Sequence, residues 1–271
     1  MNRLTTALVL FCLITPCRAA DEEKRPTAVP SRSPEHMLQR FVDECVTIKP
    51  GTKNFPASFV MGAATPGANE GPAKKVTISH SFRISRYEMT QELYQVVTGR
   101  NPSRWKGPRN SVETVSWQDA NRFCSALTRV LQMRDLISKD EIARLPTAVE
   151  WEYCCRAGTE TRYSFGDEAG KTLDEHAWHT GNAAGNDPAV GVLKPNPWGL
   201  YDVHGYLWEF VSDETATDKS TRIIRGGSWR DPHTLLSSAA YLTLPDHAAS
   251  DAIGFRCVIA SKPEAKKPSD Q

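Results

Sequence analysis

The sequence lacks the features that mark several large classes of protein. After its first 20 residues it has no apolar run close to the roughly 20 residues that a membrane-spanning helix needs. It also has no basic stripe, because its 33 basic and 32 acidic residues are mixed along the chain and give a formal net charge of +1. Since nucleic acids and anionic membranes attract clustered positive charge, we expect neither as a partner.

Cysteine is missing from places where it would carry chemistry. The chain has seven cysteines, but no CxxC pair with a matching His or Cys pair, so the sequence predicts no structural zinc site. No cysteine occurs from Trp229 to Ile253, between the strings RGGSW and GFRCV. The motifs GxSxG and HExxH are also absent, so His204, His233 and His247 have no nucleophile or zinc-protease motif beside them.

Residues 1–20, MNRLTTALVLFCLITPCRAA, are typical of a secretory signal peptide. A short basic start precedes an apolar run that is too short to span a bilayer, and two small residues end the segment. We therefore expect an exported protein, periplasmic or extracellular, without membrane attachment after cleavage. A lipoprotein anchored through Cys17 is disfavoured, because Pro16 stands where a small residue is needed.

The rest of the chain divides by composition. Residues 21–34 and 262–271 are polar and proline-rich, which predicts a flexible linker and a flexible tail. Residues 35–261 provide enough chain for one domain with a single core. Five cysteines remain after the signal segment, and export to an oxidising compartment favours disulfides among them, with at least one cysteine left over.

Local patterns predict the regular elements. Alternating apolar residues in 74–85 predict one strand, with a hydrogen-bonded structural histidine, His80, on its inner face. Three helices are expected: one from Thr90 to Gly99, one opened by Ser116-x-x-Asp119, and one opened by Thr147-x-x-Glu150 and ended by Gly158. With the final strands RIIRGGSW and GFRCVIA, these patterns indicate an α+β fold with two main helices and short antiparallel strands.

Residues 158–208 are expected to form loops and short strands. Gly, Asn, Asp and Pro recur there every few residues. The backbone amides and carbonyls of such a region have no partners in a helix or sheet, so side-chain caps, ordered water or a bound cation must satisfy them.

Six strings together give the chain a family resemblance. In order they are FVMGAA (59–64), RYEMTQELYQVVTGRNPSRWKGPRNSVETVSWQDANRFCSAL (86–127), RLPTAVEWEYCCRAGT (144–159), KPNPWGLYDVHGYLWEFVSD (194–213), RGGSW (225–229) and GFRCV (254–258). In this order they resemble the formylglycine-generating enzyme family, also called sulfatase-modifying factors, over about residues 57–261. The resemblance implies one domain of the formylglycine-generating-enzyme fold, which is C-type lectin-like and rich in ordered loops.

The resemblance also implies an activity, which this sequence departs from. The family's enzymes oxidise a cysteine of a sulfatase motif to formylglycine, with dioxygen and a copper ion held by two cysteines. Those cysteines align approximately with Asp231 and Leu236. Copper(I) prefers sulfur ligands, and a carboxylate with a leucine cannot replace two thiolates. We therefore expect no copper site and no catalytic residue of the usual kind.

The resemblance assigns two calcium sites. The first uses the side chains of Asp202 and Glu209 and the backbone carbonyls of Gly205 and Leu207, and oxygen is the ligand that calcium prefers. The alternative is that Glu209 pairs with an arginine and Asp202 caps a turn. A second, weaker site would use three residues of the string HTGNAAGND, namely Asn182, Ala183 and Asp187, although a plain turn is the favoured interpretation there.

The resemblance further implies a disulfide and a substrate cleft. The disulfide would join Cys155 to Cys257 and close a loop of about 100 residues, which the chain-entropy model values at roughly 4–5 kcal/mol. The cleft would be lined by Arg225, Ser228 and Trp229, although the RGGS string could equally serve only as a turn.

Three hypotheses of function follow. The first is an exported scaffold without copper-thiolate chemistry. It would bind a peptide, a protein such as a sulfatase, or a glycan in the cleft that the resemblance implies. The second is a divergent oxidase that makes formylglycine with other metal ligands, such as Asp231, His233 or His247. The third is a lectin-like interaction domain unrelated to sulfatases, because fold alone does not fix function.

Overall fold

The computed structural model describes residues 33–183, 187–215 and 218–263. The expected signal segment, most of the linker and most of the tail lie outside these residues. The linker was expected to run through residue 34, but Ser33 caps a helix that begins at Pro34. No helix in the described ranges combines the length and the apolar character that crossing a membrane requires.

The longer helices form where the sequence carries capping signals. The helices are α1 (Pro34–Asp43), α2 (Gln91–Thr98), α3 (Trp117–Met133), α4 (Ala148–Arg156) and the short α5 (Lys171–Asp174), with one 3-10 turn at His233–Leu235. Both predicted capping boxes are present, at the starts of α3 and α4. The end of α4 differs from the prediction by one residue, because Ala157 is the left-handed C-cap and Gly158, also at positive φ, follows it.

The strands form three small sheets. In chain order they are β1 (Cys45–Ile48), β2 (Ser58–Met61), β3 (Lys74–Thr77), β4 (Phe82–Ser85), β5 (Glu141–Arg144), β6 (Trp208–Glu214), β7 (Thr221–Arg225), β8 (Tyr241–Pro245), β9 (Ile253–Gly254) and β10 (Val258–Ser261). The sheet orders are β1-β4-β10-β5, β2-β3 and β8-β7-β6-β9. Only the β6–β9 pair among these strands is parallel, so the predicted α+β class is confirmed.

The single strand predicted for residues 74–85 is wrong. The chain forms β3 and β4 instead, and these belong to different sheets. The break lies at 78–81, where His80 leaves the strand pattern and its Nε2 lies 2.7 Å from the Glu150 carboxylate. Alternation of apolar residues continues across the break because Ile78 and Phe82 are both buried.

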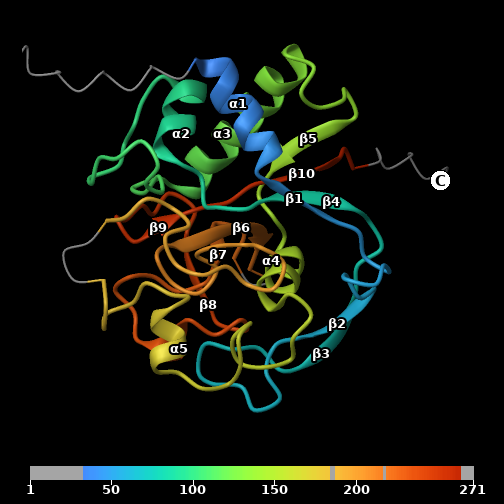
Figure 1. The fold of residues 1–271 in the computed structure, drawn as a ribbon, viewed down its shortest axis with the longest axis vertical. Helices are drawn as coiled ribbons and strands as arrows, with labels where there is room; N and C mark the ends of the chain where they lie inside the picture. The colour runs from blue at the N-terminus through green and yellow to red at the C-terminus, as the bar shows by residue number, and fades with distance from the viewer. Residues whose placement is uncertain (1–32, 184–186, 216–217, 264–271) are drawn as a thin grey trace, which may run out of the picture. The chain divides into compact units, whose positions relative to one another are not determined.

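The sheets and helices pack into two large apolar clusters. Helices α1, α2 and α3 gather beside the sheet that contains β5 and β10, while α4 lies against β6 and β7 (Figure 1). The first cluster joins α3 to Phe255 and Cys257, and the second joins α4 to the β4 and β10 strands. This packing fixes the end of β7 and the loops that follow it, where the candidate site lies.

Candidate functional site

Asp231 is a structural part of the turn that follows β7. Its Oδ2 accepts hydrogen bonds from the Trp208 indole N–H at 2.8 Å, from the Ser228 backbone N–H at 2.9 Å and from the Ser228 hydroxyl. The Asp231 N–H in turn donates to the Ser228 carbonyl at 3.0 Å. The carboxylate therefore closes the turn and anchors a tryptophan, and these contacts occupy one of its two oxygens.

Leu236 offers only an apolar side chain at the second aligned position. Its side chain is fully buried in a small cluster with Tyr163, Leu173 and Ala177. The loop around it is held by His204, whose Nδ1 donates to the Leu236 carbonyl at 2.8 Å while its Nε2 accepts from the Ser164 N–H at 3.1 Å. Burial lowers the pKa of His204 to about 4, so this histidine is neutral at physiological pH.

The alternative metal ligands are not brought together. The side chain of His233 is exposed, and that of His247 projects into solvent beside Asp246. Within the described ranges no group of three His, Cys, Asp or Glu side chains is arranged to hold a metal ion. Asp231, His233 and His247 thus do not form the donor set that a divergent oxidase would need.

An exposed surface lies next to Asp231, and we call it the Trp–Arg face. It consists of Arg104 and Trp105 from the loop before α3, Trp229 and Arg230 after β7, and Asp251 before β9. The two guanidinium groups stack on the two indoles at 4.7 and 4.5 Å from the ring centroids. Both also pair with the Asp251 carboxylate, and the Trp229 indole N–H donates to the Asp251 carbonyl at 3.2 Å. The face is therefore ordered by its own contacts and carries a net charge of about +1.

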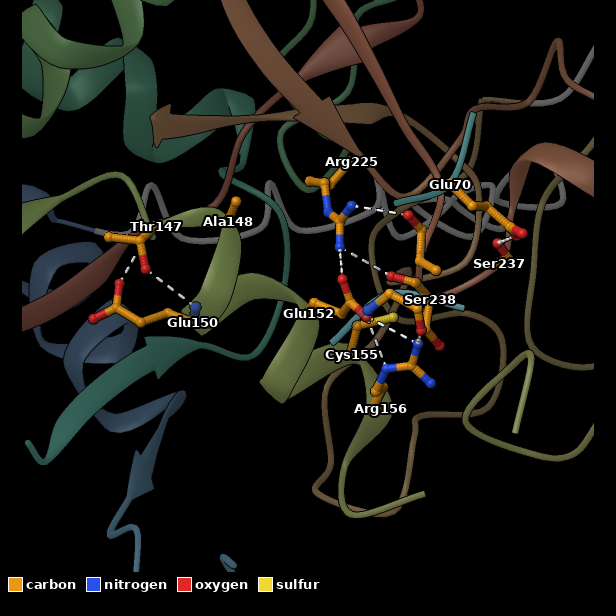
Figure 2. Close-up of polar contacts among 12 residues, drawn as sticks. Glu70, Thr147, Ala148, Glu150, Glu152, Cys155, Arg156, Arg225, Ser237 and Ser238 are labelled. Atoms are coloured by element: carbon orange, nitrogen blue, oxygen red, sulfur yellow. Dashed lines mark hydrogen bonds and ion pairs between the residues drawn. The ribbon is translucent and has the colours of Figure 1, made fainter. Parts of the chain in front are cut away.

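Only one of the three predicted cleft residues lies on this face. Trp229 is half-buried, whereas Arg225 and Ser228 are buried. Arg225 belongs to an ion-pair network in which Glu152 lies between the guanidinium groups of Arg156 and Arg225 (Figure 2). Its Nη1 donates to the Ala239 carbonyl at 3.1 Å. Arg225 therefore ties β7 to α4 instead of facing the Trp–Arg face.

The predicted calcium loop contains a buried ion pair. Glu209 accepts two hydrogen bonds from Arg256, at 2.6 and 2.7 Å, and a third from the Trp151 indole N–H at 2.8 Å. Asp202 accepts one hydrogen bond, from the Gly191 N–H at 2.8 Å. Gly205, at φ +104°, adopts a conformation that an L-residue rarely takes. The arginine alternative for Glu209 is thus present in the structure.

Charge nevertheless remains unbalanced around this loop. Glu88, Asp202 and Glu209 are all buried and interact electrostatically with a single guanidinium, that of Arg256. Burial, with Glu209 and Asp202 nearby, raises the pKa of Glu88 well above its usual value. Burial also raises the pKa of Asp202 to about 6, although its hydrogen bond from Gly191 opposes that shift. Three carboxylates with one guanidinium leave a deficit of positive charge that a divalent cation fits.

The residues of the second predicted calcium site are already engaged in other contacts. The Asn182 side chain accepts from the His179 N–H at 2.9 Å and donates to the Ala177 carbonyl. Asp187 accepts from the Asn110 side chain at 2.6 Å and from the Tyr206 hydroxyl at 3.1 Å. Ala183 follows the same turn, and its N–H donates to the His179 carbonyl at 2.9 Å.

The predicted disulfide is wrong. All five cysteines of the described ranges are free thiols, and Cys155 and Cys257 lie in different apolar clusters. The Cys155 sulfur faces the Val203 carbonyl at 3.6 Å and the His204 ring. The Cys257 sulfur lies 3.5 Å from that of Cys124 on α3, because the segment that leads into β10 packs against that helix.

Comparison with known proteins decides the family. Residues 31–261 match the family described as the sulfatase-modifying factor enzyme 1-like domain. The chain belongs to this family.

Individual relatives of this sulfatase-modifying-factor domain carry different names. The chain is 30% identical over 202 residues to the chaperone protein LppX of Paenibacillus barcinonensis, which covers 58% of this chain and 71% of LppX. It is 31% identical over 159 residues to the inactive C-alpha-formylglycine-generating enzyme 2 of Bos taurus (53% and 48%), and 29% identical over 206 residues to the formylglycine-generating enzyme of Mus musculus (62% and 51%). The chain thus spans about half the length of these two mammalian relatives.

Solved structures agree with the fold. The Treponema denticola variable protein 1 superposes with a TM-score of 0.67 at 23% identity, over 80% of this chain and 95% of that one. PvdO from Pseudomonas aeruginosa superposes with a TM-score of 0.65 at 26% identity, over 79% and 99%. The formylglycine-generating-enzyme fold expected from the sequence is confirmed.

Several residues of this sulfatase-modifying-factor domain's site were not found from the sequence. They are Glu88, Arg256 and the members of the Trp–Arg face other than Trp229. The sequence held a signal for Glu88 and Arg256. They lie in the strings RYEM and GFRCV, beside large apolar residues, and a charged residue must be paired when it is buried. The Trp–Arg face had no signal, since its residues come from three loops far apart in sequence.

Proposed function

We propose that this chain is a polypeptide-binding member of the sulfatase-modifying-factor family that does not carry out copper-thiolate oxidation. One observation carries the proposal: the two positions aligned with the copper-binding cysteines serve the fold. Asp231 closes a turn through Trp208 and Ser228, and Leu236 is fully buried. A hard carboxylate and a hydrocarbon do not supply the soft ligands that copper(I) prefers.

The names of two relatives support the proposal. One is called a chaperone and another an inactive formylglycine-generating enzyme, and both are similar to this chain at about the same identity as the active enzyme of mouse. Membership of the family is therefore compatible with a role in binding proteins. A glycan ligand and a divergent oxidase are the competing functions.

We place the polypeptide on the Trp–Arg face. Trp105 is 46% exposed, and the guanidinium groups of Arg104 and Arg230 are also exposed. Tryptophan and arginine dominate binding energy at protein interfaces, and side chains that are already ordered lose less entropy on binding. The net positive charge favours acidic or neutral peptides over basic ones.

A binding assay tests this placement. A fluorescent peptide that carries the sulfatase cysteine motif is titrated with the full chain, and a panel of glycans is tested in parallel. We expect peptide binding that weakens about tenfold or more in Trp105→Ala and Arg230→Ala, since hot-spot residues contribute about 2 kcal/mol. Met133→Ala, which removes an exposed apolar side chain on α3, is the control. Binding of glycans without peptides would contradict the proposal.

We also propose that calcium binds at Asp202 and Glu209, with the carbonyls of Gly205 and Leu207. The excess of buried carboxylates over guanidinium groups supports the site, because a divalent cation would offset it. The Oδ1 of Asp202 accepts none of the hydrogen bonds described above, and the Oε1 of Glu209 accepts only the one from Arg256. The ion would hold the loop that precedes β6.

Export remains part of the proposal. It rests on the segment at residues 1–20, which precedes the described ranges. Fractionation of cells that express the full chain, with N-terminal sequencing of the mature protein, tests it. Mature protein that begins near residue 21 outside the cytoplasm is expected, and an uncleaved cytoplasmic protein would contradict export.

A further inference from the structure

A cavity of about 210 Å³ lies between α4, the β2–β3 hairpin and the β7–β8 strands. It is separate from the residues of the Trp–Arg face, and we call it the Arg225 cavity. Its lining includes Met61, Lys74, Glu152, Ile223, Arg225 and Tyr241. Its volume is below the roughly 300–1,000 Å³ of sites for drug-sized ligands, so a small ligand or a single side chain fits.

The walls of the Arg225 cavity are mostly apolar. Met61 and Pro72 come from the hairpin, and Ile223 and Tyr241 come from neighbouring strands of the β7–β8 pair. Tyr241 is 36% exposed, which is unusual for a large aromatic side chain of this protein. An apolar group that entered would remove this surface from water, which favours binding.

Charged groups of the cavity are dominated by arginine and lysine. Glu152 is shared by Arg225 and by Arg156 behind it, so the buried network carries two guanidinium groups for one carboxylate (Figure 2). Lys74 adds an exposed ammonium group among the lining residues. The surroundings therefore favour an anion.

One polar atom of this network has no partner. The Nε of Arg225 is buried and makes no hydrogen bond within the described part of the chain. The other two nitrogens of the same guanidinium are engaged by Glu152 and by the carbonyls of Ser238 and Ala239. A buried donor without an acceptor is unfavourable, and a ligand oxygen that reached it would relieve this.

We infer that the Arg225 cavity binds a carboxylate carried on a short apolar group. The apolar group would lie against Met61, Ile223 and Tyr241, and the carboxylate would meet Arg225 and Lys74. The same chemistry occurs in a free aliphatic acid and in the C-terminal residue of a polypeptide. The inference does not depend on the proposed function, because the two sites share no residue.

Titration of the full chain with matched acids and amides tests the inference. The probes are hexanoate, hexanamide, and a short peptide that ends in leucine as either the free acid or the amide. We expect each acid to bind about tenfold more tightly than its amide, since a charge-assisted hydrogen bond is worth more than a neutral one. The methyl resonance of Met61 should shift, while that of Met133, exposed on α3, should not.

Two neighbouring lysines of β3 provide a matched pair of variants. Lys74 lines the cavity, whereas Lys75 points to the opposite side of the strand and does not. Lys74→Gln should weaken acid binding about two- to fivefold, and Lys75→Gln should leave it unchanged. Tyr241→Ala, checked for an unchanged fold by circular dichroism, should weaken both acids and amides.

The possible results distinguish the two sources of ligand, and others would overturn the inference. Binding of the peptide acid without hexanoate assigns the cavity to polypeptide C-termini, and binding of both assigns it to carboxylates in general. Equal binding of acids and amides, an unshifted Met61 resonance, or equal effects of the two lysine variants would each overturn the inference.

Discussion

The sulfur atoms of Cys124 and Cys257 lie 3.5 Å apart in the core, where α3 meets the segment that leads into β10. The two residues are 133 positions apart in sequence, so a bond between them would close most of the domain into one loop. We predict that the exported, oxidised protein carries a Cys124–Cys257 disulfide. Its reduction should lower the free energy of unfolding by about 2–5 kcal/mol.

Peptide mapping without reduction, together with urea denaturation with and without reductant, checks this prediction. Cys124→Ser should remove the dependence of stability on reductant. Cys154→Ser is the control, because Cys154 is buried away from this pair and should leave that dependence in place. A bridge between Cys155 and Cys257 in the map would contradict the structure.

Glu150 should set the stability of the domain in acid. Burial acts to raise the pKa of Glu150, but the hydrogen bonds and charge of Arg144 and the Thr147 N–H outweigh it and lower the pKa to about 2. Because the folded-state pKa lies below the unfolded value, the contribution is full above about pH 4.5 and is lost as the pH falls towards 2. It amounts to about 3 kcal/mol.

Denaturation of Glu150→Gln at several pH values measures that contribution. The variant should be less stable than the wild type by about 3 kcal/mol at pH 7 and should approach it near pH 2. Asp140→Asn, at an exposed turn, is the matched control. A constant difference between Glu150→Gln and the wild type at every pH would show that the carboxylate's charge is not the cause.

His204 should act in a different pH window. Its pKa is lowered by burial to about 4, so the unfolded state binds its proton first as the pH falls below about 6.5. Stability from the neutral ring is therefore present above pH 6.5 and is lost by pH 4, by about 3 kcal/mol. His204→Asn keeps a donor for the Leu236 carbonyl but cannot titrate, so the loss that His204 causes in the wild type across this window should be absent from the variant.

The control for His204→Asn is His247→Asn, which changes an exposed histidine. It should lose stability between pH 6.5 and 4 as the wild type does. If His204→Asn loses as much as the wild type, another group controls this window.

Calcium should stabilise the domain through the loop before β6. Adding calcium should raise the melting temperature, and a chelator should reverse the increase, because an ion that binds only the folded state stabilises it by mass action. Asp202→Asn with Glu209→Gln should abolish the shift, while Asp218→Asn, on the surface, should keep it. A melting temperature that is unchanged by calcium would remove this site from the account.

Local features of the fold could be predicted from the sequence, because their causes are local. Ser116 with Asp119 and Thr147 with Glu150 form the capping boxes that their spacing predicts. Pairing across long distances could not be predicted. Apolar alternation does not encode which sheet a strand joins, so residues 74–85 were assigned to one strand instead of two. The neighbour of Cys257 could not be predicted either, because packing, not sequence order, brings it to Cys124 on α3.

The candidate site, like the fold, could be predicted from the sequence only in part. The absence of cysteine from residues 229–253, together with the family resemblance, was enough to predict that the copper-binding thiols are missing. It could not show what replaces them, because the contacts of Asp231 with Trp208, and of Leu236 with Tyr163, join distant segments. The sequence likewise could not show that the buried charges of Glu88 and Arg256 interact, because only the fold places both near Glu209.

The central claim is that this family member does not perform copper-thiolate oxidation, and one measurement tests it most directly. The full chain is incubated with copper, a reductant, oxygen and a peptide that carries the sulfatase cysteine motif, and the peptide mass is read over time beside an active formylglycine-generating enzyme. We expect an unchanged peptide mass with this chain and conversion with the active enzyme. Conversion of the peptide cysteine to formylglycine by this chain would contradict the claim.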